Sequence, residues 1–224
     1  MSHDPQDQDE GTNRRAFLGR AVSASAALGI GVSAGAWREA HADETQGAAQ
    51  DRWLSPLKGK YRQVTDIYEP NDGWGLAYAH TFLASQGPQL PEASAVVILR
   101  HGGFVLSLGD EAWAKYKIGA AMNITDPATK AHAVRNPFLR PKPGVLLTDD
   151  MAIDRLLARG VIFGACNVAL QVLSGRLSGQ AGVTPEVALK DWTAAVIPGI
   201  HVIPSGVWGV NRAQIAGCSY CSGG

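Results

Sequence analysis

Apolar and polar positions along the chain alternate between two patterns. Short apolar runs bounded by glycine or polar residues indicate buried strands, and they cover residues 63–68, 95–100, 161–163 and 200–203. Between them, apolar residues recur at helical spacing, opened by capping residues and closed by glycine. Strands that alternate with helices predict a mainly parallel sheet covered on both faces and connected by right-handed crossovers.

Cys166 stands where one of these strands gives way to a helix. It follows the apolar run 161–163, and Asn167, a residue that caps helices, comes next. A helix N-terminus favours the thiolate, which is the nucleophilic form of cysteine. A free cysteine is also one of the most buried residue types and often only packs. Both interpretations, nucleophile and core residue, stay open.

Two further junctions resemble that of Cys166. His101, Gly102 and Gly103 directly follow the strand 95–100, and Ser205 with Gly206 opens a helix after the strand 200–203. A parallel sheet places all these residues at its carboxyl edge, where open α/β sheets bind ligands. His101 either holds and supplies a proton there or is an incidental histidine in a turn.

The chain contains three cysteines, and two of them, Cys218 and Cys221, form a C-x-x-C near the C-terminus. No histidine follows the motif, which excludes c-type haem attachment, and three cysteines fall short of a four-ligand zinc or iron–sulfur set. We therefore predict no cofactor and no metal. The pair is either a redox pair serving Cys166 or an unrelated tail disulfide or two unused thiols.

A long segment with four prolines, residues 122–144, separates the helical patterns in the middle of the chain. Connections of this length in a compact domain are usually lids, binding loops or subunit contacts.

The charge balance narrows the class of partner. The 224 residues include 20 basic and 20 acidic side chains, and 46% are hydrophobic, as is usual for a globular protein. Nucleic acid and anionic membranes attract a concentrated basic face, which this sequence does not have. Nucleic acid is therefore excluded as the main partner, and small molecules or other proteins remain.

The N-terminal segment has the features of an export signal. Arg14 and Arg15 precede a mildly apolar region, and Ala40-His41-Ala42 supplies an A-x-A cleavage site. This pattern predicts a twin-arginine signal that engages the twin-arginine export machinery and is cleaved near Ala42. A retained anchor helix is the alternative, but the apolar run is short against the ~20 residues of a membrane span, so no stable membrane insertion is expected.

Export defines the expected organisation and location of the chain. Residues 1–42 are the twin-arginine signal peptide, 43–58 a polar linker, and 59–224 a single α/β domain. The mature protein is expected in the periplasm, where disulfides form.

Three segments resemble one known family. VVILRHGG, GVIFGACNVAL and IPGIHVIPSGVWGVNRAQIAGCSY are similar to DsrE/DsrF-like proteins, in particular to an exported, twin-arginine-tagged branch, over residues 61–220. The resemblance implies a three-layer α/β/α sandwich with a central, mainly parallel sheet of about five strands. It also implies a homo-oligomer and, as in the sulfur-relay members, a persulfide on one cysteine, which by position is Cys166.

Two functional hypotheses follow. In the first, the protein is a sulfur or thiol carrier, with sulfurtransferase-like activity left open, and its ligand is a small sulfur-containing or thiol compound. In the second, it is a non-catalytic periplasmic ligand-binding or accessory module that uses the same carboxyl-edge pocket. The residues assigned are, as catalytic, Cys166 and His101; as ligand-binding, Gly102, Gly103, Asn167, Ser205 and Gly206; and as the redox pair, Cys218 and Cys221.

Overall fold

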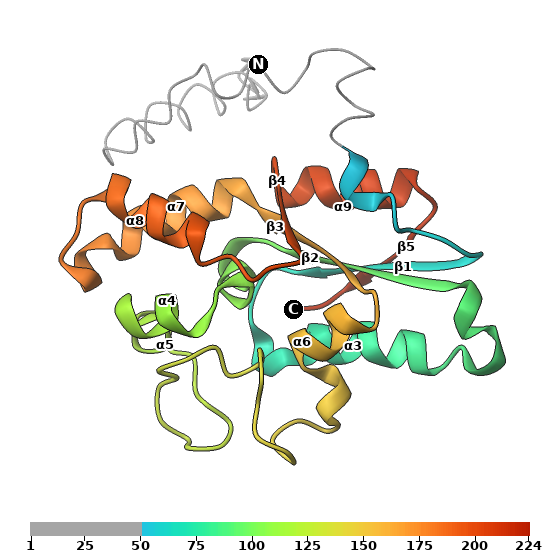
Figure 1. Cartoon of the computed structure of the whole chain (residues 1–224), viewed down its shortest axis with the longest axis horizontal. Coiled ribbons are helices and arrows are strands. Elements are labelled where there is room, and N and C mark those ends of the chain that lie inside the picture. The colour runs from blue at the N-terminus through green and yellow to red at the C-terminus, as the bar shows by residue number, and fades with distance from the viewer. Residues whose placement is uncertain (1–50) are drawn as a thin grey trace, which may run out of the picture. The chain divides into compact units, whose positions relative to one another are not determined.

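A computed structural model of the protein describes residues 51–224 (Figure 1). The predicted signal peptide, 1–42, lies outside the described residues, as does the first part of the predicted linker.

The centre of the fold is one sheet of five parallel strands in the order β4-β3-β2-β1-β5. The strands are β1 (Tyr61–Ile67), β2 (Ala93–Leu99), β3 (Ile162–Cys166), β4 (Ile200–Ile203) and β5 (Ser219–Ser222). The first four confirm the strands predicted from the apolar runs. The fifth, β5, contains the second cysteine of the C-x-x-C and was not predicted.

The helices that connect the strands are α3 (Trp74–Ala84), α4 (Asp110–Lys115), α5 (Ile118–Ala121), α6 (Ile153–Ala158), α7 (Asn167–Leu177), α8 (Pro185–Ala194) and α9 (Gly206–Ile215). Short 3₁₀ turns join them, including η2 (Asp51–Leu54), η5 (His101–Ser107) and η6 (Asp149–Met151). The segment between α5 and η6, residues 122–148, has no helix or strand. We call it the long loop, and it contains the predicted proline-rich loop.

The strand order decides which face each helix covers. From β1 to β4 every crossover steps the same way across the sheet, whereas the crossover from β4 to β5 returns past β1. Right-handed crossovers therefore place the helices that follow β1, β2 and β3 on one face, and α9 on the other. Figure 1 shows α9 across the sheet from α3 and α6.

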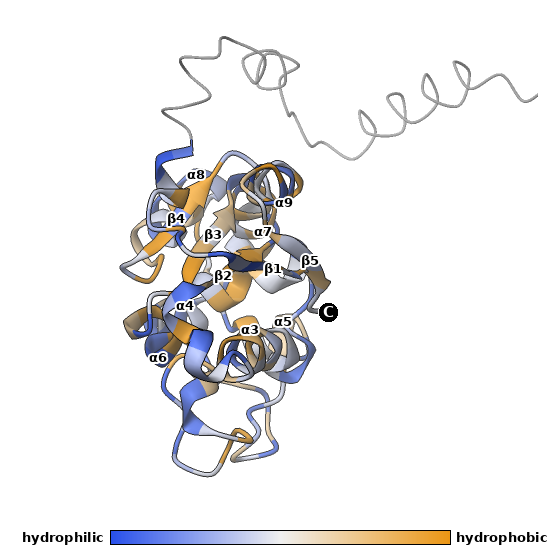
Figure 2. Ribbon diagram, turned by 90° about the vertical axis from the view of Figure 1, so that its right-hand side faces the viewer, coloured by the Kyte–Doolittle hydropathy of each residue, from blue (hydrophilic) through white to orange (hydrophobic). Residues whose placement is uncertain are grey.

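The core has two parts because the sheet is covered on both faces. The larger apolar cluster joins the sheet to the helices between β1 and β4, and it includes the buried Phe104, Trp113 and Trp192. The smaller one lies under α9 and includes Val96, Ile98 and Ile203. In Figure 2 the hydrophobic ribbon of β3 and β4 lies between helices. The predicted three-layer α/β/α sandwich is confirmed.

Local signals explain several helix ends. The hydroxyl of Ser205 accepts a hydrogen bond from the amide of Trp208 (3.2 Å) and caps α9, as expected from its position. Residues 110–121 form two short helices, because Lys117 between them has a φ of 47°. The helix α7 continues to Leu177, which is buried.

The predicted linker 43–58 is too long. Residues 51–54 form η2, in which Trp53 and Leu54 are buried against the α9 face of the sheet, and the Asp51 carboxylate pairs with the Arg212 guanidinium on α9. The apolar pair therefore makes this segment part of the domain. None of the helices formed by residues 51–224 has the length and apolar character of a membrane-spanning segment.

Candidate functional site at the carboxyl edge

The carboxyl ends of β3 and β4 mark the point where the crossovers change face. α7 follows β3 onto one face, α9 follows β4 onto the other, and the two strands pair directly, with Cys166 opposite Ile203. Diverging helices open a crevice between adjacent strand ends, and open α/β sheets bind ligands there. The topology thus singles out the junctions of Cys166 and Ser205.

Cys166 is the last residue of β3 and itself caps α7. Its Sγ accepts a hydrogen bond from the Ala169 amide (3.4 Å), so Cys166 holds the capping position predicted for Asn167, which is the first helical residue. The N–H donor and the helix dipole both favour negative charge on the sulfur. Only 6% of the residue is exposed, and it contacts the larger apolar cluster.

Arg100, directly after β2, makes the strongest polar contact at this edge. Its guanidinium donates two hydrogen bonds to the buried Asp66 carboxylate on β1, from Nε (2.7 Å) and Nη2 (2.9 Å). The Tyr220 hydroxyl donates to the same carboxylate (3.1 Å). Because Leu99 pairs with Ala165, the next residues along the two strands, Arg100 and Cys166, are neighbours. We call Asp66, Arg100, Cys166 and Tyr220 the carboxyl-edge cluster.

Electrostatics connects the members of this cluster. The hydrogen bonds to Asp66 and its negative charge raise the pKa of Arg100, while partial burial opposes the effect. Burial raises the pKa of Tyr220, and the neighbouring Asp66 raises it further. Arg100 thus stays cationic.

The glycine of the α9 junction has a packing role. A Cβ on Gly206 would lie 2.3 Å from Cβ of Arg100, so glycine leaves room for the arginine side chain. Ser205 and Asn167 are half-buried and stand at the first turns of α9 and α7. The structure therefore brings Arg100, Cys166 and the two predicted junction residues to one edge.

His101 lies apart from this arrangement. It is exposed, has a φ of 46°, and within residues 51–224 it makes no hydrogen bond to Cys166. The two glycines that follow let this segment pack closely against the end of β1 and the residues after it. A Cβ on Gly102 would lie 2.3 Å from the Glu69 carboxylate, and a Cβ on Gly103 would lie 2.4 Å from the Ile67 carbonyl oxygen. The residue that follows the neighbouring strand end is Arg100, and its guanidinium reaches Asp66 on β1.

The two cysteines of the C-x-x-C do not pair in this structure. Cys218 and Cys221 are both free thiols. Three residues of extended chain span roughly 10 Å, beyond the ~7 Å Cα separation that a disulfide tolerates. The strand that holds Cys221, β5, is also three strands away from β3, or about 14 Å at the usual spacing. A redox pair serving Cys166 would need backbone movement.

The environments of the two thiols differ. Burial under α9 raises the pKa of Cys218 to about 11, although Arg62 opposes the shift, and burial also raises the pKa of the half-buried Cys221. Both are therefore weaker nucleophiles at neutral pH than a free thiol. Within residues 51–224, no group of three or more His, Cys, Asp and Glu side chains could hold a metal ion.

Arg100, Asp66 and Tyr220 were missed in the sequence analysis. Two signals were present: an arginine that ends an otherwise apolar strand, and an aspartate inside another. A charge in a buried strand is rare unless it is paired, so the two residues could have been matched as partners.

No protein-family model and no curated protein matches the chain. Among solved structures, it is similar to a protein of unknown function, MTH1491, from Methanobacterium thermoautotrophicum, with a TM-score of 0.39 and 20% identity over 73% of this chain and 99% of that one.

Proposed function

We propose that this protein is a periplasmic sulfur or thiol carrier that holds a persulfide on Cys166, after export by the twin-arginine pathway. The observation that carries the proposal is the position of the sulfur. It lies at the switch point of the sheet, accepts an N–H hydrogen bond at a helix start, and interacts through charge with Arg100, which follows the neighbouring strand β2. The amide donor and the helix start can stabilise negative charge that forms on the sulfur during transfer.

The reaction needs no group beyond the thiol and a sulfur donor. The Cys166 thiolate attacks the terminal sulfur of a persulfide R–S–SH; the donor S–S bond breaks, the thiolate RS⁻ leaves with its electron pair, and Cys166 becomes Cys–S–SH. Arg100 stabilises negative charge on the incoming and bound sulfur. Because Cys166 is buried, a donor must displace neighbouring side chains, so small anionic sulfur compounds are the favoured donors.

The alternative is a binding or accessory module without covalent chemistry at the same edge. The burial of Cys166 in the apolar cluster favours it, as does the packing role of Gly206. In that case Arg100 and the N-terminus of α9 bind an anionic ligand, and the thiol contributes only packing.

Sulfur loading of Cys166→Ser separates the two functions. Reduced wild-type protein is incubated with sodium polysulfide, and added sulfur is located by peptide mass spectrometry. A carrier loads on Cys166, and Cys166→Ser abolishes loading while Cys218→Ser and Cys221→Ser, the matched controls, retain it. Arg100→Gln is expected to slow loading because it removes the neighbouring cation.

The same preparations are tested for stability. A purely packing cysteine predicts that Cys166→Ser places an unpaired hydroxyl in an apolar site, at a cost of about 1 to 3 kcal/mol. A destabilised Cys166→Ser protein that takes up sulfur like the wild type would exclude the carrier function.

A further inference from the structure

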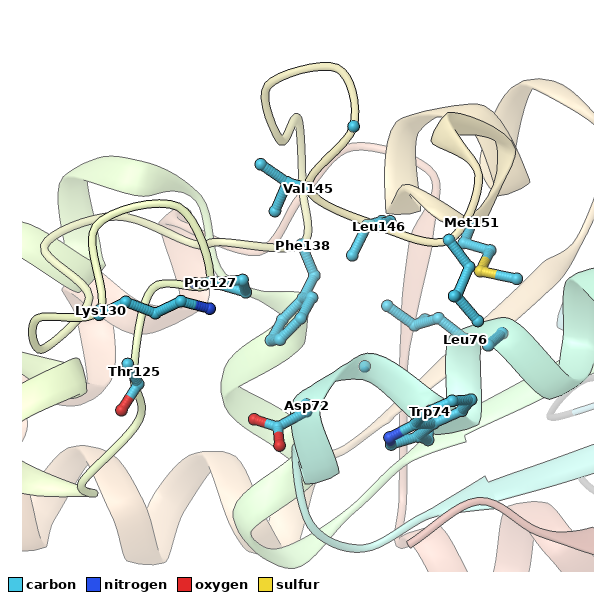
Figure 3. Close-up of a pocket in the computed structure, with 14 residues that line it drawn as sticks. Asp72, Trp74, Leu76, Thr125, Pro127, Lys130, Phe138, Val145, Leu146 and Met151 are labelled. Atoms are coloured by element: carbon cyan, nitrogen blue, oxygen red, sulfur yellow. The ribbon is translucent and has the colours of Figure 1, made fainter.

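A pocket of about 590 Å³ lies between the start of α3 and the long loop, and it contains no residue of the carboxyl-edge cluster. Its wall is mostly apolar, and Figure 3 shows the side chains that form it. The apolar lining consists of Trp74, Leu76, Ala77, Phe138, Val145, Leu146, Leu147 and Met151. Volumes of about 300 to 1,000 Å³ with such a lining are typical of small-molecule sites.

The charged groups of the pocket lie at one end. Lys130 and Asp72 are its charged lining residues, and in Figure 3 the ammonium and the carboxylate lie on the side away from Leu76 and Met151. Among the described residues, neither side chain forms a hydrogen bond or an ion pair within 4.0 Å. The pocket thus offers one charge of each sign beside an apolar wall.

Both charged residues are held by unusual backbone. Asp72 has a φ of 49° and Lys130 a φ of 61°, in the left-handed region that side chains disfavour. Residues in such conformations cluster at ligand clamps. Gly73, next to Asp72, lies so close to the Phe138 ring that a Cβ there would be 2.8 Å from it. The start of α3 and the long loop therefore pack tightly at this point.

We infer that this pocket binds an apolar zwitterion of dipeptide size. The ligand carboxylate pairs with Lys130, its ammonium with Asp72, and its apolar side chains with the wall near Leu76 and Met151. A simple organic anion or cation would meet one repelling charge, whereas a zwitterion satisfies both. The site is separate from Cys166 and stands whatever the proposed sulfur chemistry proves to be.

Isothermal titration calorimetry with L-leucyl-L-phenylalanine tests the inference. Binding is expected, and N-acetylation or C-amidation of the probe should each weaken it about tenfold or more, because each removes one charge-assisted contact. Glycylglycine, which lacks the apolar groups, should not bind measurably.

Variants assign each contact. Asp72→Asn tolerates the same backbone and should remove the preference of the protein for the free peptide over its N-acetyl form. Lys130→Met should remove the preference for the free peptide over its C-terminal amide. Lys142→Met on the same loop and Asp154→Asn on α6 lie outside the pocket and should bind like the wild type. No heat of binding at millimolar dipeptide, or equal affinity for the free and blocked peptides, would overturn the inference.

Discussion

Replacing Arg100 by methionine removes the cation of the carboxyl-edge cluster while keeping the aliphatic part of the side chain. Asp66 then loses two hydrogen bonds and its counter-charge, and the Tyr220 hydroxyl remains as a donor. The exposed fraction of the Asp66 side chain is only 3%, so water cannot replace the lost contacts.

The burial of each partner sets the size of the effect. Removing one partner of a buried ion pair costs about 3 to 5 kcal/mol, whereas an exposed pair contributes about 0 to 1 kcal/mol. Because 21% of the Arg100 side chain is exposed, solvent screens part of the interaction, and we expect a loss of roughly 2 to 3 kcal/mol. For a domain of this size that lowers the melting temperature by about 5 to 10 °C.

Urea unfolding of wild type, Arg100→Met, Asp66→Asn and the double variant measures the coupling, and Arg212→Met is the matched control. Arg212 pairs with Asp51, whose side chain is 26% exposed, so the same substitution should cost less than about 1 kcal/mol there. Equal losses for the two arginine variants, or strictly additive losses in the double variant, would refute the reasoning.

Four further predictions concern other parts of the chain. Gly103→Ala should cost about 2 kcal/mol or more in urea unfolding because its Cβ meets the backbone carbonyl of Ile67. Gly102→Ala meets only the end of the exposed Glu69 side chain, which can move aside, and should cost less than about 0.5 kcal/mol. Burial raises the pKa of Cys218 to about 11, whereas the same thiol in the unfolded chain ionises near the free-thiol value of about 8.5. The free energy of unfolding should therefore fall as pH rises between these two values. The fall should be smaller in Cys218→Ala. Light scattering should give a mass above that of one chain, and Val172→Lys should reduce it, because Val168 and Val172 are exposed one turn apart on α7; a single-chain mass for the wild type contradicts this. Replacing both Arg14 and Arg15 by lysine should leave the precursor in the cytosol, and normal maturation of that variant on fractionation would reject the signal assignment.

The elements that could be predicted are those with local signals. Ser205 and Cys166 were expected at strand-to-helix junctions because capping chemistry and apolar runs lie within a few residues of each other. β5 was missed because SYCS has neither a β-branched residue nor a regular alternation, and only its hydrogen bonds to β1 make it a strand.

The polar part of the site could not be predicted in the same way. Asp66 and Arg100 are 34 residues apart, and their contact depends on which strands are neighbours. Likewise, the proline-rich segment suggested a binding loop, but the positions of Lys130 and Asp72 across one pocket follow from how the loop packs on α3.

The pairing of β5 with β1 has a consequence for the order of folding. Tyr220 and Asp66 are separated by 154 residues, whereas β1 to β4 are joined by successive crossovers. Closing so long a loop is slow relative to local contacts. The free side of β1 therefore stays open during synthesis until β5 has emerged from the ribosome, and the Tyr220–Asp66 hydrogen bond reports that the sheet is complete.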